Sequence, residues 1–187
     1  MVYGGAMDAR AARKQIHFME LCDNFHIPVI FFVDVPGFMV GLAAEKEGAL
    51  REGMRAVYAA GKMTVPTFTL VIRKCYGMAG MATCNKNGVD MKVAWPSAEW
   101  GSLPVEGGVA AAFRREIAAA DDPAAKEREI EAEIRPYTSP FRTAEAFEVE
   151  EIIDPRETRP FFCKFVELAY ERMKLSLGPQ SKAGVQP

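Results

Sequence analysis

The segment of this chain best suited to chemistry is a short stretch near its middle, Tyr76-Gly77-Met78-Ala79-Gly80. It follows an apolar, β-branched run, residues 67–72, and has the small residues of a tight turn that opens a helix. The first N–H groups of a helix have no partner within it, so they bind anions or a developing oxyanion without a charged side chain. Spacing alone leaves a second role open, in which Gly77 and Gly80 serve only the turn and its packing.

A second glycine-bearing loop follows another apolar run, residues 28–33, and extends from Asp34 to Gly41. Gly37 and Gly41 permit close approach of the backbone, and Pro36 stiffens the turn. Continuous apolar runs of this kind are typical of parallel strands buried on both faces. Sites in such folds gather at the carboxyl ends of the strands, which is where both loops fall.

Other catalytic groups are sparse. His17 and His26 lie in and beside the first expected helix, away from any nucleophile motif, so structural or exposed roles are favoured for both. Glu45 and Glu47 follow the second loop, but acidic residues on a first helical turn are more often partners of the helix dipole than catalysts. No serine-hydrolase elbow, zinc-protease or phosphate-loop motif occurs. The four cysteines form no CxxC pair, so neither a metal site nor a disulfide framework is expected.

Length and composition indicate an ordinary folded protein. The chain has 187 residues, of which 49% are apolar and 26% charged, enough for one domain with a full core. A formal net charge of -2 with interspersed signs gives no basic face, so nucleic acid is not an expected partner. The sequence shows neither a signal-peptide pattern nor an apolar stretch of about 20 residues. We therefore expect no membrane segment, and a location in the cytoplasm or an organelle matrix.

Two helices are predicted to flank the first strand. The first begins after Asp8 and ends near Asn24, with an apolar stripe at i, i+3, i+4 and i+7 formed by Phe18, Leu21, Cys22 and Phe25. The second covers residues 43–62, and its stripe is formed by Leu50, Met54, Val57 and Tyr58. A helix leading into a buried strand, repeated along the chain, indicates a parallel sheet.

The remaining pattern continues this α/β order. A helix should follow the turn as far as Lys86, and residues 89–94 alternate like a strand. The elements expected beyond Pro96 are a short strand at 98–103, helices at 107–120, 124–134 and 139–146, a strand at 149–153 and a helix at 158–175. Residues 1–175 thus form one domain, and residues 176–187 are a flexible, Gly- and Pro-bearing tail.

Several stretches of the sequence resemble one enzyme family in order and spacing. They are Gly4-Gly-Ala-Met-Asp8, Ile27-Pro28, Val33-Asp-Val-Pro-Gly-Phe38, Gly41 with Glu45, Arg73-Lys74 with Tyr76-Gly77, Ala94-Trp-Pro-Ser-Ala-Glu99, Phe113-Arg114 and Ile152-Ile-Asp-Pro-Arg-Glu-Thr-Arg159. They are similar to the C-terminal half of the carboxyltransferase (β) subunit of biotin-dependent acyl-CoA carboxylases, such as the propionyl-CoA carboxylase β subunit. The resemblance implies a crotonase-like fold, a ββα superhelix, in a carboxyltransferase C-terminal domain that lacks its first strands here.

The resemblance also implies a mechanism that explains the missing acid–base residues. This half would bind carboxybiotin, presented on a carrier protein, and the N-terminal half of another subunit would bind the acyl-CoA. The biotin oxyanion would be held by the amides of Met78 and Ala79, which stand where the family has Gly and Ala. Gly37, Phe38, Tyr76 and Gly77 would line the cofactor site, and Met81 falls on a position associated with acyl-chain selection. Implied partners are the N-terminal half, biotin carboxylase and carrier subunits, and further copies in a homo-oligomer.

Departures from the family keep alternatives open. Met78 adds a side chain where the family usually has none, and Trp100-Gly101-Ser102-Leu103-Pro104 replaces a more aliphatic segment. With its N-terminal half absent, the isolated chain is expected to have no carboxyltransferase activity. One alternative is a subunit of a biotin-dependent acyl-CoA decarboxylase, which runs related chemistry in reverse. The other is an inactive fragment that acts as an oligomer scaffold.

Overall fold

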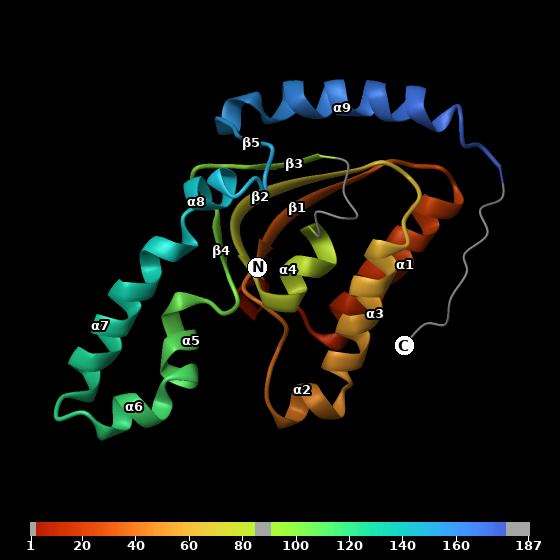
Figure 1. The fold of residues 1–187 in the computed structure, drawn as a ribbon. Helices are drawn as coiled ribbons and strands as arrows, with labels where there is room; N and C mark the ends of the chain where they lie inside the picture. The colour runs from red at the N-terminus through yellow and green to blue at the C-terminus, as the bar shows by residue number, and fades with distance from the viewer. Residues whose placement is uncertain (1–2, 85–90, 179–187) are drawn as a thin grey trace.

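The computed structural model describes residues 3–84 and 91–178, and its centre is a parallel sheet (Figure 1). The strands are β1 (Val29–Val35), β2 (Thr67–Tyr76), β3 (Met91–Ala94), β4 (Glu99–Gly101) and β5 (Glu151–Ile152). The strand order is β1-β2-β3-β5. The short strand β4 pairs with the carboxyl-terminal end of β2, past the part of β2 that pairs with β3. Every pairing is parallel, as the sequence pattern predicts.

Helices cover both faces of this sheet. On one face, α1 (Ala9–Asn24), α3 (Ala49–Gly61) and α4 (Gly77–Cys84) pack together through Ala12, Ile16, Ala56 and Ala82. On the other, the long helix α9 (Thr158–Met173) places Phe165 and Ala169 against Phe68, Leu70 and Val93 of the strands (Figure 1). The sheet is therefore the middle layer, and its buried strands explain the continuous apolar runs in the sequence.

Local sequence sets the helix boundaries. Asp8 caps α1 by accepting a hydrogen bond from the amide of Ala11 at 2.7 Å. Asp122 caps α7 (Pro123–Ile134) in the same way through Ala125 at 3.0 Å, with proline at the first helical position. The predicted start of α1 is confirmed, and α7 begins at Pro123, just before the predicted start at Ala124.

The predicted apolar stripes of α1 and α3 are wrong in part. In α1 the buried residues include Ala9, Ala12, Ile16, Met19 and Cys22, whereas Phe18 and Phe25 are 55% and 69% exposed. In α3 the buried positions are Ala49, Glu52, Gly53 and Ala56, and Leu50 is exposed. Small residues let the two helices approach each other and α4 closely, and the larger side chains lie outside this helix contact. Periodicity gives the spacing of a stripe but not which of two apolar faces is buried.

The C-terminal part contains shorter elements. Its helices are α5 (Val105–Ala112), α6 (Arg114–Ala119), α7 and α8 (Pro140–Glu145), with 3-10 turns at Arg135–Thr138 and Pro155–Glu157. The predicted helix at 107–120 is two helices, because the chain leaves helical geometry at Phe113. A further kink at Glu106 and Gly107 lies in the first turn of α5. Helices α5 to α7 form an arm that extends away from the sheet around Val105, Val109 and Ile130 (Figure 1).

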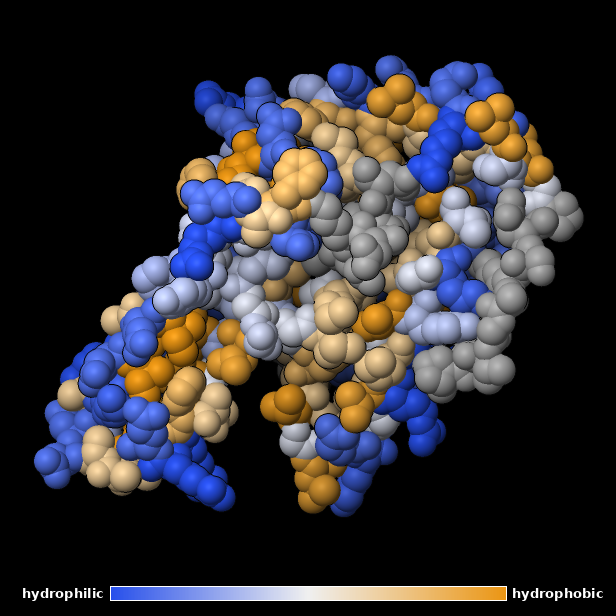
Figure 2. Space-filling view, in the orientation of Figure 1, coloured by the Kyte–Doolittle hydropathy of each residue, from blue (hydrophilic) through white to orange (hydrophobic). Residues whose placement is uncertain are grey.

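Two features concern the surface and the ends. A short helix, α2 (Leu42–Lys46), follows the loop after β1, and Figure 2 shows apolar side chains at the surface around it, where Val40, Leu42 and Leu50 are exposed.

No helix in the described residues is long and apolar enough to cross a bilayer. The predictions for Lys86 and for most of the tail, 179–187, lie outside the described residues.

Candidate functional site

The two glycine-bearing loops follow neighbouring strands at the same edge of the sheet. β1 and β2 run parallel, and Val35 lies opposite Cys75 near their carboxyl ends. β2 is longer than predicted, because Arg73 and Lys74 continue the strand instead of starting the turn. The pairing register shifts here, because Val33 pairs with Val71 whereas Val35 pairs with Cys75. β2 therefore has extra residues at this point, as in a β-bulge. The loops after the two strands therefore begin side by side, as expected (Figure 1).

The turn between β2 and α4 has no connecting residue: the strand ends at Tyr76 and the helix begins at Gly77. Gly77 has a φ of 57°, in the left-handed region, and a Cβ there would lie 3.2 Å from the carbonyl oxygen of Ser102. The backbone conformation therefore favours glycine, and a side chain there would also be in tight contact with the Ser102 carbonyl. Within the described residues, neither the Met78 nor the Ala79 amide donates a hydrogen bond outside α4.

The surroundings of these two amides differ. Ala79 is 0% exposed and belongs to the core cluster under the sheet, whereas Met78 is only half-buried. Gly80 fits tightly, since a Cβ there would lie 2.8 Å from the sulfur of Cys75. The glycines therefore do have the packing role left open by the sequence. That role is compatible with an anion site, because close packing fixes the direction of the first-turn amides.

Tyr76 holds the turn in place from the strand side. Its ring is buried, and its hydroxyl donates a hydrogen bond to Oε2 of Glu99, at 3.0 Å, on the adjacent strand β4. Burial, and then the Glu99 carboxylate, raise the pKa of the Tyr76 phenol well above its usual value. The phenol thus stays neutral and serves β2–β4 pairing, which leaves its main chain to face the turn.

The first loop is anchored from two sides. Phe38 forms a parallel bridge with Met7, in which the Met7 amide donates to the Gly37 carbonyl at 2.9 Å and the Met39 amide to the Met7 carbonyl at 2.8 Å. The ring of Phe38 lies directly over Gly53 of α3, where a Cβ would be 2.7 Å from Cζ. Gly37 has a φ of 142°. Phe38 is thus held as an apolar wall beside the same core that contains Ala79.

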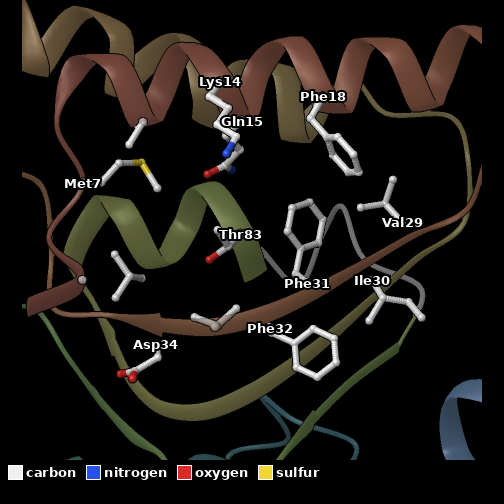
Figure 3. Close-up of a pocket in the computed structure, with 14 residues that line it drawn as sticks. Met7, Lys14, Gln15, Phe18, Val29, Ile30, Phe31, Phe32, Asp34 and Thr83 are labelled. Atoms are coloured by element: carbon white, nitrogen blue, oxygen red, sulfur yellow. The ribbon is translucent and has the colours of Figure 1, made fainter. Parts of the chain in front are cut away.

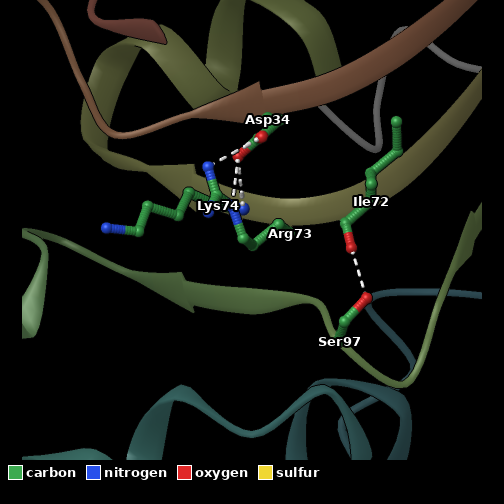
Figure 4. A network of polar contacts seen from close by, with 5 residues as sticks. All are labelled: Asp34, Ile72, Arg73, Lys74 and Ser97. Carbon is green, nitrogen blue, oxygen red and sulfur yellow. Dashed lines mark hydrogen bonds and ion pairs between the residues drawn. The ribbon is translucent and has the colours of Figure 1, made fainter. Parts of the chain in front are cut away.

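A polar network missed by the sequence analysis links the two strands. Asp34, at the end of β1, accepts hydrogen bonds from Nε and Nη2 of Arg73 at 3.2 and 3.1 Å and from the Lys74 amide at 3.1 Å (Figure 4). Nearby, the Ser97 hydroxyl donates to the Ile72 carbonyl at 2.7 Å (Figure 4). The sequence does place an acidic residue at the end of one strand and a basic residue late in the next. That pattern predicts an ion pair only when the pairing register of the two strands is known.

The other predicted residues lie outside this arrangement. Met81 is 45% exposed on α4, facing away from the core side occupied by Ala79 and Ala82. Glu45 and Glu47 are exposed on and just after α2. His17 is exposed, and His26 ends α1 in the left-handed region, where its Nε2 accepts a hydrogen bond from the Gly178 amide at 3.4 Å. Within residues 3–84 and 91–178, no cluster of three His, Cys, Asp or Glu side chains suits a metal ion.

A pocket of about 380 Å³ lies between α1 and β1 (Figure 3). Its wall includes Phe18, Phe31 and Phe32 with the polar side chains of Lys14 and Gln15. In the described part of the chain β1 pairs only with β2, so its other edge borders this pocket. An unpaired, apolar strand edge is a template for another strand.

A parallel sheet covered by helices on both faces, with two glycine-bearing loops at the carboxyl ends of neighbouring strands, places the chain in the α/β class. The carboxyl transferase domain matches residues 1–182, and this chain belongs to that family. It is 40% identical over 169 residues to the methylmalonyl-CoA carboxyltransferase 12S subunit of Propionibacterium freudenreichii subsp. shermanii, covering 89% of this chain and 32% of that protein. It is 39% identical over 160 residues to the propionyl-CoA carboxylase carboxyltransferase subunit of Haloferax mediterranei, covering 84% and 31%.

Solved structures agree with this assignment. The transcarboxylase 12S crystal structure, described as a hexamer assembly with methylmalonyl-CoA bound, matches with a TM-score of 0.80 and 38% identity, over 100% of this chain and 36% of that one. The β subunit of P. aeruginosa geranyl-CoA carboxylase matches with a TM-score of 0.83 at 21% identity, over 89% of this chain and 33% of that one, which supports the fold alone. The crotonase-like expectation is confirmed. The chain spans about a third of the length of the relatives it matches.

Proposed function

We propose that this chain is the carboxybiotin-binding half of the carboxyltransferase component of a biotin-dependent acyl-CoA carboxylase. The observation that carries the proposal is the strand-to-helix turn at Gly77, where the first amides of α4 have no described acceptor outside their helix. Its chemistry matches the reaction, because an oxygen that gains negative charge needs aligned N–H donors and no acid or base side chain. Membership of the carboxyl transferase family supports the same assignment.

The donor set fits the ureido oxygen of biotin. Carboxybiotin, when bound, would supply the carboxyl group and, after its release, the base that removes the α-proton of the acyl-CoA. The chain's own contribution would be positional: the amides of Met78 and Ala79 hold the ureido oxygen, while Gly37 and the anchored ring of Phe38 limit the space beside it. Tyr76 would keep the turn in register through Glu99, at 3.0 Å. Met81, exposed three residues beyond Met78, would face the acyl chain.

The site requires a second half. The chain spans about a third of its relatives, and the edge of β1 beside the α1 pocket is open to a further strand. We propose that residues 1–175 form the carboxyltransferase C-terminal domain, and that an N-terminal, acyl-CoA-binding half completes the site. Biotin carboxylase and carrier subunits would be the other partners. The exposed apolar residues Val40, Leu42 and Leu50 support assembly into a homo-oligomer.

A decarboxylase subunit is the second candidate. The chain is 37% identical over 160 residues to the methylmalonyl-CoA decarboxylase subunit alpha of Propionigenium modestum, close to its identity with the carboxylases. The amides of Met78 and Ala79 would serve carboxylation and decarboxylation alike, since both reactions pass through the same biotin oxyanion. The two are distinguished by partner subunits: a biotin carboxylase indicates carboxylation, whereas a membrane pump indicates decarboxylation.

Amide resonances of the chain mixed with an N-terminal half test the site directly. We expect biotin to shift and protect the Met78 and Ala79 amides, while pentanoate, which lacks the ureido ring, leaves them unchanged. Met78→Gly should tighten biotin binding by removing the side chain at the mouth of the turn. Met81→Ala is the matched control on the same helix, and it should alter acyl-CoA preference without changing biotin affinity.

Activity gives the second readout. Carboxyl transfer from carboxybiotin to an acyl-CoA is expected with both halves present and absent with the isolated chain. Biotin that leaves both amides unmoved in the reconstituted pair would reject the carboxybiotin site and favour an oligomer scaffold.

A further inference from the structure

A second pocket, of about 340 Å³, lies among residues of β3, β4 and α8. Its lining comes from β3, β4, the turn before α8, α8 itself and the loop after α8: Lys92, Trp100, Tyr137, Arg142, Thr143, Ala146 and Glu148. No lining residue belongs to the Gly37 loop or the Gly77 turn. The pocket is therefore a separate feature of the fold, and its chemistry does not depend on the proposed carboxyl transfer.

Lys92 is an unusual residue for this place. It is only 5% exposed, yet within the described residues its ammonium forms no ion pair with a carboxylate. Its described side-chain contact is with the indole of Trp100, whose ring centre lies 5.6 Å from Nζ. Its main chain is fixed, because the Lys92 amide donates to the Glu150 carboxylate at 2.6 Å. A buried charge is normally paired, and a cation–π contact replaces only part of the lost hydration.

Trp100 carries the second unsatisfied group. Its Nε1–H is buried and, among the described residues, has no hydrogen-bond acceptor. Trp95 shows the ordinary arrangement, since its Nε1–H donates to the Thr158 hydroxyl at 3.0 Å. Buried indole N–H groups usually have a partner. The pocket therefore holds one cation and one donor for which the described part of the chain supplies no oxygen acceptor.

The rest of the wall favours a negatively charged ligand. Arg142 adds a second cation, stacked 4.4 Å from the ring centre of Tyr137, and Glu148 contributes the one acidic side chain of the lining. We propose that this pocket binds a small oxyanion, a carboxylate or a phosphate, whose oxygens accept hydrogen bonds from Lys92 Nζ and Trp100 Nε1. A neutral ligand would satisfy the indole but leave the buried ammonium without a counter-charge.

The indole N–H resonances of the full chain provide the test, because it has only two tryptophans. Uniformly ¹⁵N-labelled protein is titrated with inorganic phosphate and, separately, with malonate, at constant ionic strength set with sodium chloride. We expect the Trp100 indole resonance to move downfield and saturate in at least one titration, while the Trp95 resonance, already bonded to Thr158, stays in place. Trp100→Phe assigns the signal.

Matched lysine variants identify the cause. Lys92→Met should weaken binding at least about tenfold, as expected for losing a hydrogen bond to a charged group. Lys62→Met is the control, because Lys62 also lies over a ring, that of Tyr58 at 5.2 Å, but outside the pocket. An unchanged Trp95 resonance shows that each variant is folded. A response to phosphate alone or to malonate alone supports the site and names its ligand class. A Trp100 resonance unmoved by both anions, or moved equally in Lys92→Met, overturns the proposal.

Discussion

The hydroxyl of Tyr76 lies 3.0 Å from Oε2 of Glu99 and donates a hydrogen bond to it, joining the last residue of β2 to the first residue of β4. The same tyrosine ring packs under Gly101, where a Cβ would be 2.9 Å from it. One side chain thus ties two strands together immediately before the Gly77 turn.

Tyr76→Phe should lower the free energy of unfolding by about 1 to 2 kcal/mol, because the half-buried Glu99 carboxylate loses its donor. Urea denaturation monitored by circular dichroism measures this change. Tyr170→Phe is the control: that ring is half exposed on α9, and its loss should change the free energy by less than about 0.5 kcal/mol. Equal effects of the two variants would show that the Glu99 contact contributes nothing.

The raised pKa of Tyr76 predicts a specific loss of stability in alkali. Below about pH 10, the usual tyrosine pKa, folded and unfolded chains both keep the phenolic proton, and the contribution is complete. Above it the unfolded chain releases this proton while the folded chain retains it, so the free energy of unfolding falls as pH rises towards the folded pKa. The wild-type chain should therefore lose stability more steeply than Tyr76→Phe above about pH 10.

Absorbance at 295 nm provides an independent check of that titration. The raised pKa of Tyr76 predicts a late ionisation step in the folded chain, and that step should vanish in Tyr76→Phe. A native titration curve whose late step is unchanged in Tyr76→Phe would contradict the burial of this group.

The parallel sheet was predictable because buried strands have continuous apolar runs. The runs at 28–33 and 67–72 become β1 and β2, and the loops after them do meet at one edge. The buried faces of α1 and α3 were not predictable from periodicity, since each helix has two apolar faces. Only packing between helices selects the face with Ala12 and Ala56 over the one with Phe18 and Leu50.

The site was predictable to the level of its loops. Gly77 stands out in sequence as a turn residue, and its φ of 57° explains why. The Asp34–Arg73 pair and the Lys92–Trp100 pair were not predictable, because each joins residues whose proximity depends on strand register or on a short strand such as β4. Polar contacts of this kind require the fold before they can be recognised.

Gly77→Ala should destabilise the chain by about 1 to 2 kcal/mol, since alanine is strained in the left-handed region and its Cβ would crowd the Ser102 carbonyl at 3.2 Å. Thermal unfolding measures the change. Gly61→Ala, at the end of α3, is the matched control: no atom lies within 4 Å of its Cβ, and alanine there should be neutral or stabilise by up to about 1 kcal/mol. A tolerated Gly77→Ala would contradict the turn geometry.

Gly53→Ala tests whether α3 holds the Phe38 ring in position. Alanine inside a helix is intrinsically favoured by about 1 kcal/mol, but here its Cβ would lie 2.7 Å from Cζ of Phe38, an overpacking that costs about 1 to 3 kcal/mol. The substitution should therefore destabilise the wild-type chain. In a Phe38→Ala background the clash is gone, and the same substitution should stabilise.

Urea denaturation of the wild-type chain, the two single variants and the double variant gives the coupling energy between Gly53→Ala and Phe38→Ala, which we expect to exceed about 1 kcal/mol. Identical effects of Gly53→Ala in both backgrounds would mean that α3 does not position the ring, and Phe38 could then not act as a fixed wall of the proposed cofactor site.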